Sequence, residues 1–240
     1  MNRRARILVG VWCSAVLVAA AGPPSADESA ARKRDQTALK AYGQLVGSWR
    51  GVGMVERNNR KGAWTESAEW VWKLDKSSAS LLLKLDRGKY LKSAILSSGE
   101  KPGVFRLEAT LADDSKRSFE GKAGDRDKLV LIATEKAAEG VGRITLSPLH
   151  ETRFLLLLEA PVPDSDSYRR LGEVGYTRNG VAFAAGDSYP KCVVTEGRGT
   201  IKVSYKGETY YVCCSGCKEL FEENPAAIIA EAKEREKNHK

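Results

Sequence analysis

The chain has 240 residues, of which 42% are hydrophobic and 29% are charged. This composition is typical of a globular protein, and it excludes a wholly disordered chain, a collagen-like repeat and a polytopic membrane protein. The formal charge is +8, but Arg3, Arg4 and Arg6 at the N-terminus carry part of it and leave about +5 for the rest of the chain. No block of five or six basic residues follows, so we predict that the chain does not bind nucleic acid.

Residues 1–26 have the pattern of a secretory signal peptide. The arginines precede a continuous run of apolar or small residues, Ile7–Ala21, which is too short to span a bilayer comfortably. Cleavage is expected after Ala21 or after Ala26, an uncleaved membrane anchor is the alternative, and Cys13 falls within the leader. We therefore predict export to the periplasm or cell envelope, with no stable membrane span after cleavage.

The next segments change in character along the chain. Residues 27–36 are rich in Ala and charge and predict a disordered lead-in, and Thr37–Val46 predicts a short helix. Short alternating apolar runs then predict ten strands without intervening helices. These are 49–56, 67–74, 79–85, 90–96, 104–111, 117–121, 128–134, 142–146, 152–159 and 169–178. We predict a mainly β fold in which residues 37–185 form an antiparallel up-and-down β-barrel.

A short motif at the start of this region adds a family resemblance. The run Leu45–Gly51 contains Gly47-Ser48-Trp49, and it resembles the opening of the lipocalin-like (calycin) barrels. The resemblance implies that Trp49 plugs one end of a closed barrel, and that the barrel binds a hydrophobic ligand or haem. Trp70 and Trp72 share a face and could line a cavity, but we favour core packing for them. His150, which is the only histidine in the region, is interpreted as a surface turn residue rather than a haem ligand.

A small polar linker, 179–188, separates the barrel from a second unit over residues 189–240. Ile201–Tyr205 and Glu208–Cys213 predict a hairpin around Lys206-Gly207. Cys217–Glu223 predicts a helical turn, and Asn224 with Pro225 predicts the start of a further helix. We expect a small α+β cysteine module.

The four remaining cysteines all lie in this module, which favours a local site. Cys192 is expected in a loop, Cys213 and Cys214 at the end of a strand, and Cys217 at a helix start, where free N–H groups stabilise a thiolate. Because neighbouring strand residues point to opposite faces, Cys214 is the least certain ligand of the four. Thiolate clusters select Zn(II), Cu(I) or heavier thiophilic ions.

The module resembles the YHS/TRASH family of small metal-binding domains. The matching residues are Cys192–Thr195, Ile201–Lys218, Phe221 and Asn224-Pro225. Twenty residues separate Cys192 from Cys213 and three separate Cys213 from Cys217, as in TRASH modules. One departure is Val193, where family members often carry proline. The resemblance implies metal binding in proteins of heavy-metal sensing, trafficking or resistance.

Other chemistries remain open at these cysteines. In an exported protein, the even number of cysteines also fits disulfides. Cys214-Ser215-Gly216-Cys217 is formally a redox motif, but the βαβ setting of redox enzymes is missing from the sequence pattern. His239 is expected to be frayed at the chain end, and the sequence contains no familiar catalytic motif, so we predict that the protein is not an enzyme.

We therefore predict an exported protein that captures, senses or traffics one Zn or Cu ion through Cys192, Cys213, Cys217 and Cys214. A metal transporter or another envelope protein is the candidate partner. The alternative is a barrel-based carrier of a small hydrophobic ligand, in which the cysteine module is a structural zinc or disulfide staple.

Overall fold

A computed structural model describes residues 25–135, 139–179 and 189–238 of the chain. The predicted signal peptide lies almost wholly outside the described residues, and so does most of the predicted linker. Among the helices that are described, none has both the length and the apolar character needed to cross a membrane.

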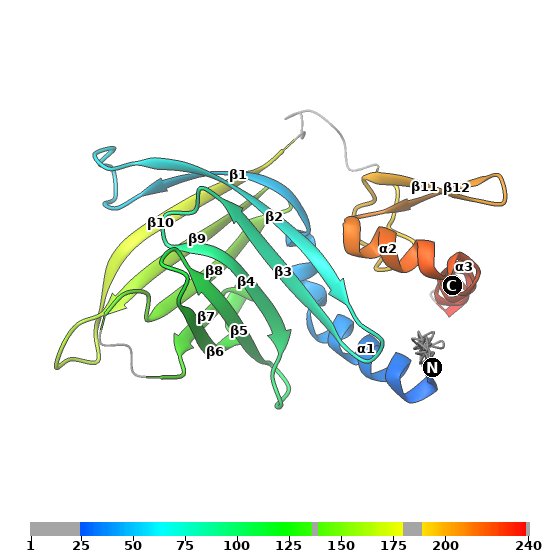
Figure 1. The fold of residues 1–240 in the computed structure, drawn as a ribbon, viewed down its shortest axis with the longest axis horizontal. Coiled ribbons are helices and arrows are strands. Elements are labelled where there is room, and N and C mark those ends of the chain that lie inside the picture. The colour runs from blue at the N-terminus through cyan, green and yellow to red at the C-terminus, as the bar shows by residue number, and fades with distance from the viewer. Residues whose placement is uncertain (1–24, 136–138, 180–188, 239–240) are drawn as a thin grey trace, which may run out of the picture.

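Ten antiparallel strands within these residues close into a barrel, which confirms the predicted fold class (Figure 1). The strands are β1 (Gly47–Met54), β2 (Trp64–Leu74), β3 (Ala79–Asp86), β4 (Leu91–Ser98), β5 (Val104–Leu111), β6 (Lys116–Ala123), β7 (Leu129–Ala133), β8 (Arg143–His150), β9 (Arg153–Pro161) and β10 (Tyr168–Arg178). Each strand pairs with the next, and β10 returns to pair with β1, where Arg178 lies opposite Trp49. Every predicted strand overlaps one of these, because alternating burial leaves a period of two in the sequence.

The barrel interior is filled by large side chains. Trp49 and Trp70 are fully buried and Trp72 is nearly so. The space left among Trp70 and eight aliphatic side chains is about 10 Å³. Because small-molecule pockets have roughly 300 Å³ or more, this space accommodates no organic ligand. The structure therefore supports core packing for Trp70.

One end of the barrel is closed by η1 (Lys40–Leu45), a 3₁₀ helix that occupies part of the predicted helical segment. The indole N–H of Trp49 donates a hydrogen bond of 2.7 Å to the last carbonyl of η1. The Arg178 guanidinium lies 4.1 Å from the centre of the Trp49 ring and donates to the carbonyls of Gln44 and Val46. The cation–π contact and the hydrogen bonds together fix η1 over this end.

The predicted disordered lead-in over 27–36 is wrong, because these residues form the helix α1 (Ala26–Ala38). Ser25 and Glu28 make a capping box at its start, in which each side chain accepts the backbone N–H of the other residue. The Asp35 carboxylate accepts hydrogen bonds from β3 and β4. The helix is thus fixed both locally and by the barrel.

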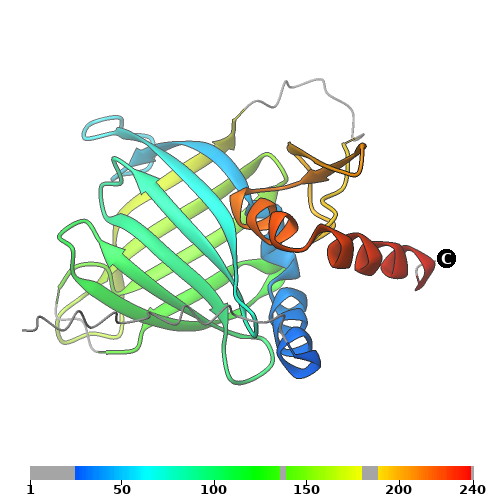
Figure 2. The same cartoon turned by 45° about the vertical axis from the view of Figure 1, so that its right-hand side comes forward.

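The cysteine module packs beside the barrel. Its elements are β11 (Ile201–Tyr205), β12 (Glu208–Val212), α2 (Ser215–Glu223) and α3 (Pro225–Asn238). Lys206 and Gly207 both have positive φ, as the predicted two-residue hairpin turn requires. The Asn224 side chain accepts the Ala227 N–H at the start of α3, as predicted. Figures 1 and 2 both place α2 next to β2, and the buried residues of module and barrel form one continuous cluster.

The 3₁₀ helix η2 (Asp125–Asp127) completes the described elements, and it connects β6 to β7. It contacts β8 of the barrel and takes no part in the candidate site below.

Candidate metal centre

Cys192 is held by a tight turn that precedes the hairpin. Its N–H donates to the Gly197 carbonyl over 2.7 Å, and its carbonyl accepts the Glu196 N–H over 2.8 Å. The N–H of Val193 donates to the Tyr211 carbonyl of β12, also over 2.8 Å. Proline could not make this last bond because it lacks the N–H. Val193 therefore attaches the Cys192 turn to the hairpin.

Cys213, Cys214 and Cys217 lie at the junction between β12 and α2. The strand ends at Val212, Cys214 is the N-cap of α2, and Cys217 lies in the first helical turn. The expectation that Cys213 and Cys214 face opposite ways fails, because the chain leaves the strand before reaching them. Their sulfur atoms lie 3.9 Å apart.

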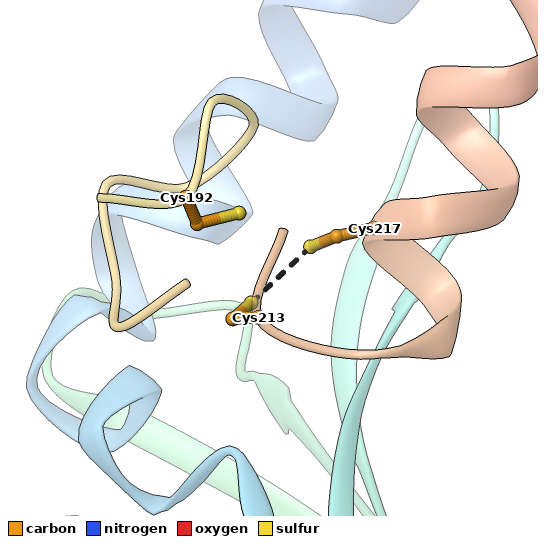
Figure 3. Close-up of side chains that lie close together, drawn as sticks. All are labelled: Cys192, Cys213 and Cys217. Carbon is orange, nitrogen blue, oxygen red and sulfur yellow. Dashed lines mark hydrogen bonds between the residues drawn. The ribbon is translucent and has the colours of Figure 1, made fainter. Parts of the chain in front are cut away.

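The side chains of Cys192, Cys213 and Cys217 point toward one another in Figure 3. Their three sulfur atoms all lie within 4.8 Å of one another, and those of Cys213 and Cys217 are 3.5 Å apart. A tetrahedral zinc ion with metal–sulfur bonds of about 2.3 Å holds its sulfur ligands about 3.8 Å apart. The donor type and the spacing therefore fit Zn(II) or another thiophilic ion. Cys214 lies beside this group of three but is outside it.

All four cysteines of the module are buried and free of disulfides. Hydrogen bonds among them lower the pKa of two and raise the pKa of the other two. Hydrogen bonds from Cys213 and Cys217 lower the pKa of Cys192, and the same two partners lower the pKa of Cys214. Hydrogen bonding to Cys192 and burial raise the pKa of Cys213 and Cys217. The cluster thus favours thiolate at Cys192 and Cys214, and thiolate is the form that binds metals.

A cleft of about 1050 Å³ lies between α1, η1 and the module, and Cys213 is the cysteine of the cluster that lines it. Arg32 and Lys40 line the cleft from the side of α1 and η1, and Lys191 and Arg198 line it from the module. Although Cys213 is only 5% exposed, it therefore faces the open space beside the cluster.

Two residues contact the cluster in ways that were not expected from the sequence. The Thr195 hydroxyl lies 3.4 Å from the Cys213 sulfur, and Thr195 also hydrogen-bonds to Cys192. The backbone N–H of Trp72, in the barrel, donates to the Cys214 sulfur over 3.4 Å. Thr195 belongs to the quoted family motif and could have been singled out, whereas a backbone amide carries no residue-specific signal.

Of the two histidines in the sequence, the structure describes His150. His150 is exposed at the end of β8, where its Nδ1 lies 3.3 Å from the Thr152 hydroxyl. This is the surface position that the sequence predicted. His239 lies outside the described residues.

The comparisons with known proteins do not assign the chain to a family. No family model matches the chain, and no curated protein matches it.

Proposed function

We propose that this chain is an exported protein that captures a thiophilic metal ion, Zn(II) or Cu(I), through Cys192, Cys213 and Cys217. The observation that carries the proposal is the convergence of three buried sulfur atoms within 4.8 Å of one another. Thiolates select soft or borderline ions over Mg²⁺ and Ca²⁺. Because binding displaces thiol protons, the metal affinity is expected to fall as the pH falls.

The family resemblances support the same reading. The three cysteines with the TRASH-like spacing, Cys192, Cys213 and Cys217, are the three that converge. The calycin-like motif lies where Trp49 packs against η1 and plugs one barrel end. We propose that the chain combines a calycin-like barrel with a YHS/TRASH-like metal module.

We propose metal handling rather than catalysis or permanent structural binding. Cys213 faces a cleft large enough to admit part of another molecule. An ion held at one ligand beside open space can be passed on by ligand exchange, whereas a fully enclosed zinc is usually structural. The candidate partner is a metal transporter or another envelope protein that reaches Cys213 through this cleft.

The alternative role as a carrier of hydrophobic molecules has no comparable support. The residual space around Trp70 is about 10 Å³, so a carrier role would require the barrel core to rearrange. The metal proposal requires no such change, because the sulfur atoms already lie at suitable distances.

Native mass spectrometry of the purified protein after incubation with Zn²⁺ or Cu(I) tests the proposal. We expect one ion per chain, and we expect Cys213→Ser or Cys217→Ser to weaken binding at least about 10-fold because each removes a ligand. Ser215→Ala is the matched control: Ser215 is an exposed neighbour in α2 and offers no sulfur. A metal-free mass lacking two hydrogens per disulfide, under non-reducing conditions, would contradict metal capture.

A further inference from the structure

The barrel and the cluster meet at Trp72, near the end of β2. The pairing of β2 with β1 ends at Trp70, opposite Gly47, whereas on its other side β2 continues to pair with β3 through Trp72 and Leu81. In an antiparallel sheet, the N–H and C=O of one residue point to the same side. The polar backbone groups of Trp72 that face away from β3 therefore extend beyond the start of β1.

The module covers this overhang with the start of α2. The Trp72 N–H donates to the Cys214 sulfur over 3.4 Å. The backbone of Gly216 lies so close to the Trp72 carbonyl that a Cβ on Gly216 would overlap its oxygen. Two independent contacts, one through a sulfur atom and one through a glycine, thus seat the cysteine cluster on the same barrel residue.

The Cys214 sulfur contacts both the barrel and the other cysteines. Its sulfur accepts the Trp72 amide and lies 3.9 Å from the Cys213 sulfur, close to the separation of about 3.8 Å expected for two ligands of one tetrahedral ion. A thiolate sulfur has several lone pairs, so one can accept an N–H while another binds the metal, and the hydrogen bond stabilises part of the negative charge. Partners of this kind tune metal affinity by about 10- to 100-fold.

We infer that the barrel is part of the metal centre: Cys214 is the fourth thiolate, and the Trp72 amide is the donor that holds it in place. Metal binding then strengthens the seating of the module on the barrel, and by linkage the seating strengthens metal binding by the same factor. This inference rests on the proposed metal capture.

The full chain, labelled with ¹⁵N and loaded with the spin-half isotope of cadmium, provides the test. We expect the cadmium signal of a four-thiolate site and a scalar coupling between cadmium and the Trp72 amide proton, which requires a sulfur that binds the ion and accepts the N–H. Hydrogen exchange at the Trp72 amide should slow at least about 10-fold on loading.

Each outcome has a distinct meaning. Cadmium bound by three thiolates without coupling to Trp72 overturns this inference and leaves the proposed metal capture intact. Four thiolates without coupling or slowed exchange overturn the role of the barrel. Failure to bind cadmium at all overturns the proposed function and this inference together.

A pair of glycine variants provides a second test. Gly216→Ala forces α2 away from Trp72, and we expect it to weaken cadmium affinity about 10- to 100-fold. Gly175→Ala, in β10 of the barrel, is the matched control, because its added Cβ meets its nearest neighbour, a Leu155 methyl group, at an ordinary 3.6 Å. Equal affinities in the two folded variants would contradict the inference, and the measurements on the unmodified chain decide it if Gly216→Ala does not fold.

Discussion

The barrel and the cysteine module differ in what holds them together. The barrel closes its own sheet and fills its interior with residues such as Trp49, Trp70 and Phe154, so its sheet and core are complete without a ligand. The module has a two-stranded sheet and two helices, and its buried residues include all four cysteines. Units of this size usually need a metal, a disulfide or a partner surface to stay folded. The dependence is therefore expected to run in one direction, from the module to the metal and the barrel.

Metal removal is expected to have the largest effect, and we expect it to destabilise the module but not the barrel. After chelation of the loaded protein, we expect proteolysis within residues 189–238 to become at least about 10-fold faster, while the ten strands stay resistant. Limited proteolysis followed by mass analysis of the fragments measures this, and adding Zn²⁺ back is the control. Equal loss of protection in the barrel would show that the two units depend on each other.

Truncation of the barrel core tests whether the module depends on the barrel. Trp49→Ala is expected to lower the free energy of unfolding of the barrel by about 3–5 kcal/mol, because it empties the space beneath η1 and removes the contact with Arg178. Urea unfolding measures the change, and the module should unfold with the barrel. Val52→Ala, on the outer face of the same strand, is the control and should cost less than about 1 kcal/mol. A module that stayed folded and metal-bound after the barrel unfolds would refute the proposed dependence.

The smallest expected effect concerns a single hydroxyl at the closed barrel end. Within the described residues, the buried Tyr42 hydroxyl has no hydrogen-bond partner, and burial together with Asp127 raises its pKa to about 12. The unfolded chain ionises this tyrosine near pH 10. Its contribution to stability is therefore present below pH 10 and is lost as the pH rises toward 12.

Tyr42→Phe isolates this contribution. Because the variant loses a buried hydroxyl that has no partner, it should be about 1 kcal/mol more stable than the unmodified protein at pH 8, and this difference should grow by about 1 kcal/mol at pH 11. Urea unfolding at both pH values measures the difference. An identical loss of stability in both proteins would mean that Tyr42 does not titrate as its burial implies.

The barrel was predictable because its determinants are local. Alternating burial marks each strand, and Asp114, between β5 and β6, is of a residue type that tolerates the positive φ found there. The α1 helix was missed because it contains few apolar residues. It is stabilised instead by the capping box and by Asp35, which accepts hydrogen bonds from the Ala79 N–H and the Ser98 hydroxyl. Contacts between residues so distant in the chain leave no periodic pattern.

The site was predictable to a similar extent. The spacing of Cys192, Cys213 and Cys217 pointed to the three sulfur atoms that converge. The position of Cys214 was misjudged because strand alternation was extended past Val212, where the strand ends. The Trp72 amide could not be predicted, because every residue except proline has this group and only the tertiary fold decides which one meets a sulfur.

The pairing of the first strand with the last has a consequence for how such a chain can be assembled from parts. Because β1 and β10 are neighbours, the polypeptide enters and leaves the barrel at adjacent strands, roughly 4.8 Å apart. A unit whose two ends lie together can be inserted into, joined to or excised from another gene product without opening its sheet. The barrel can therefore be exchanged between proteins as one unit. A new neighbouring domain would have to fit the barrel surface at Trp72, where Gly216 of the module now packs.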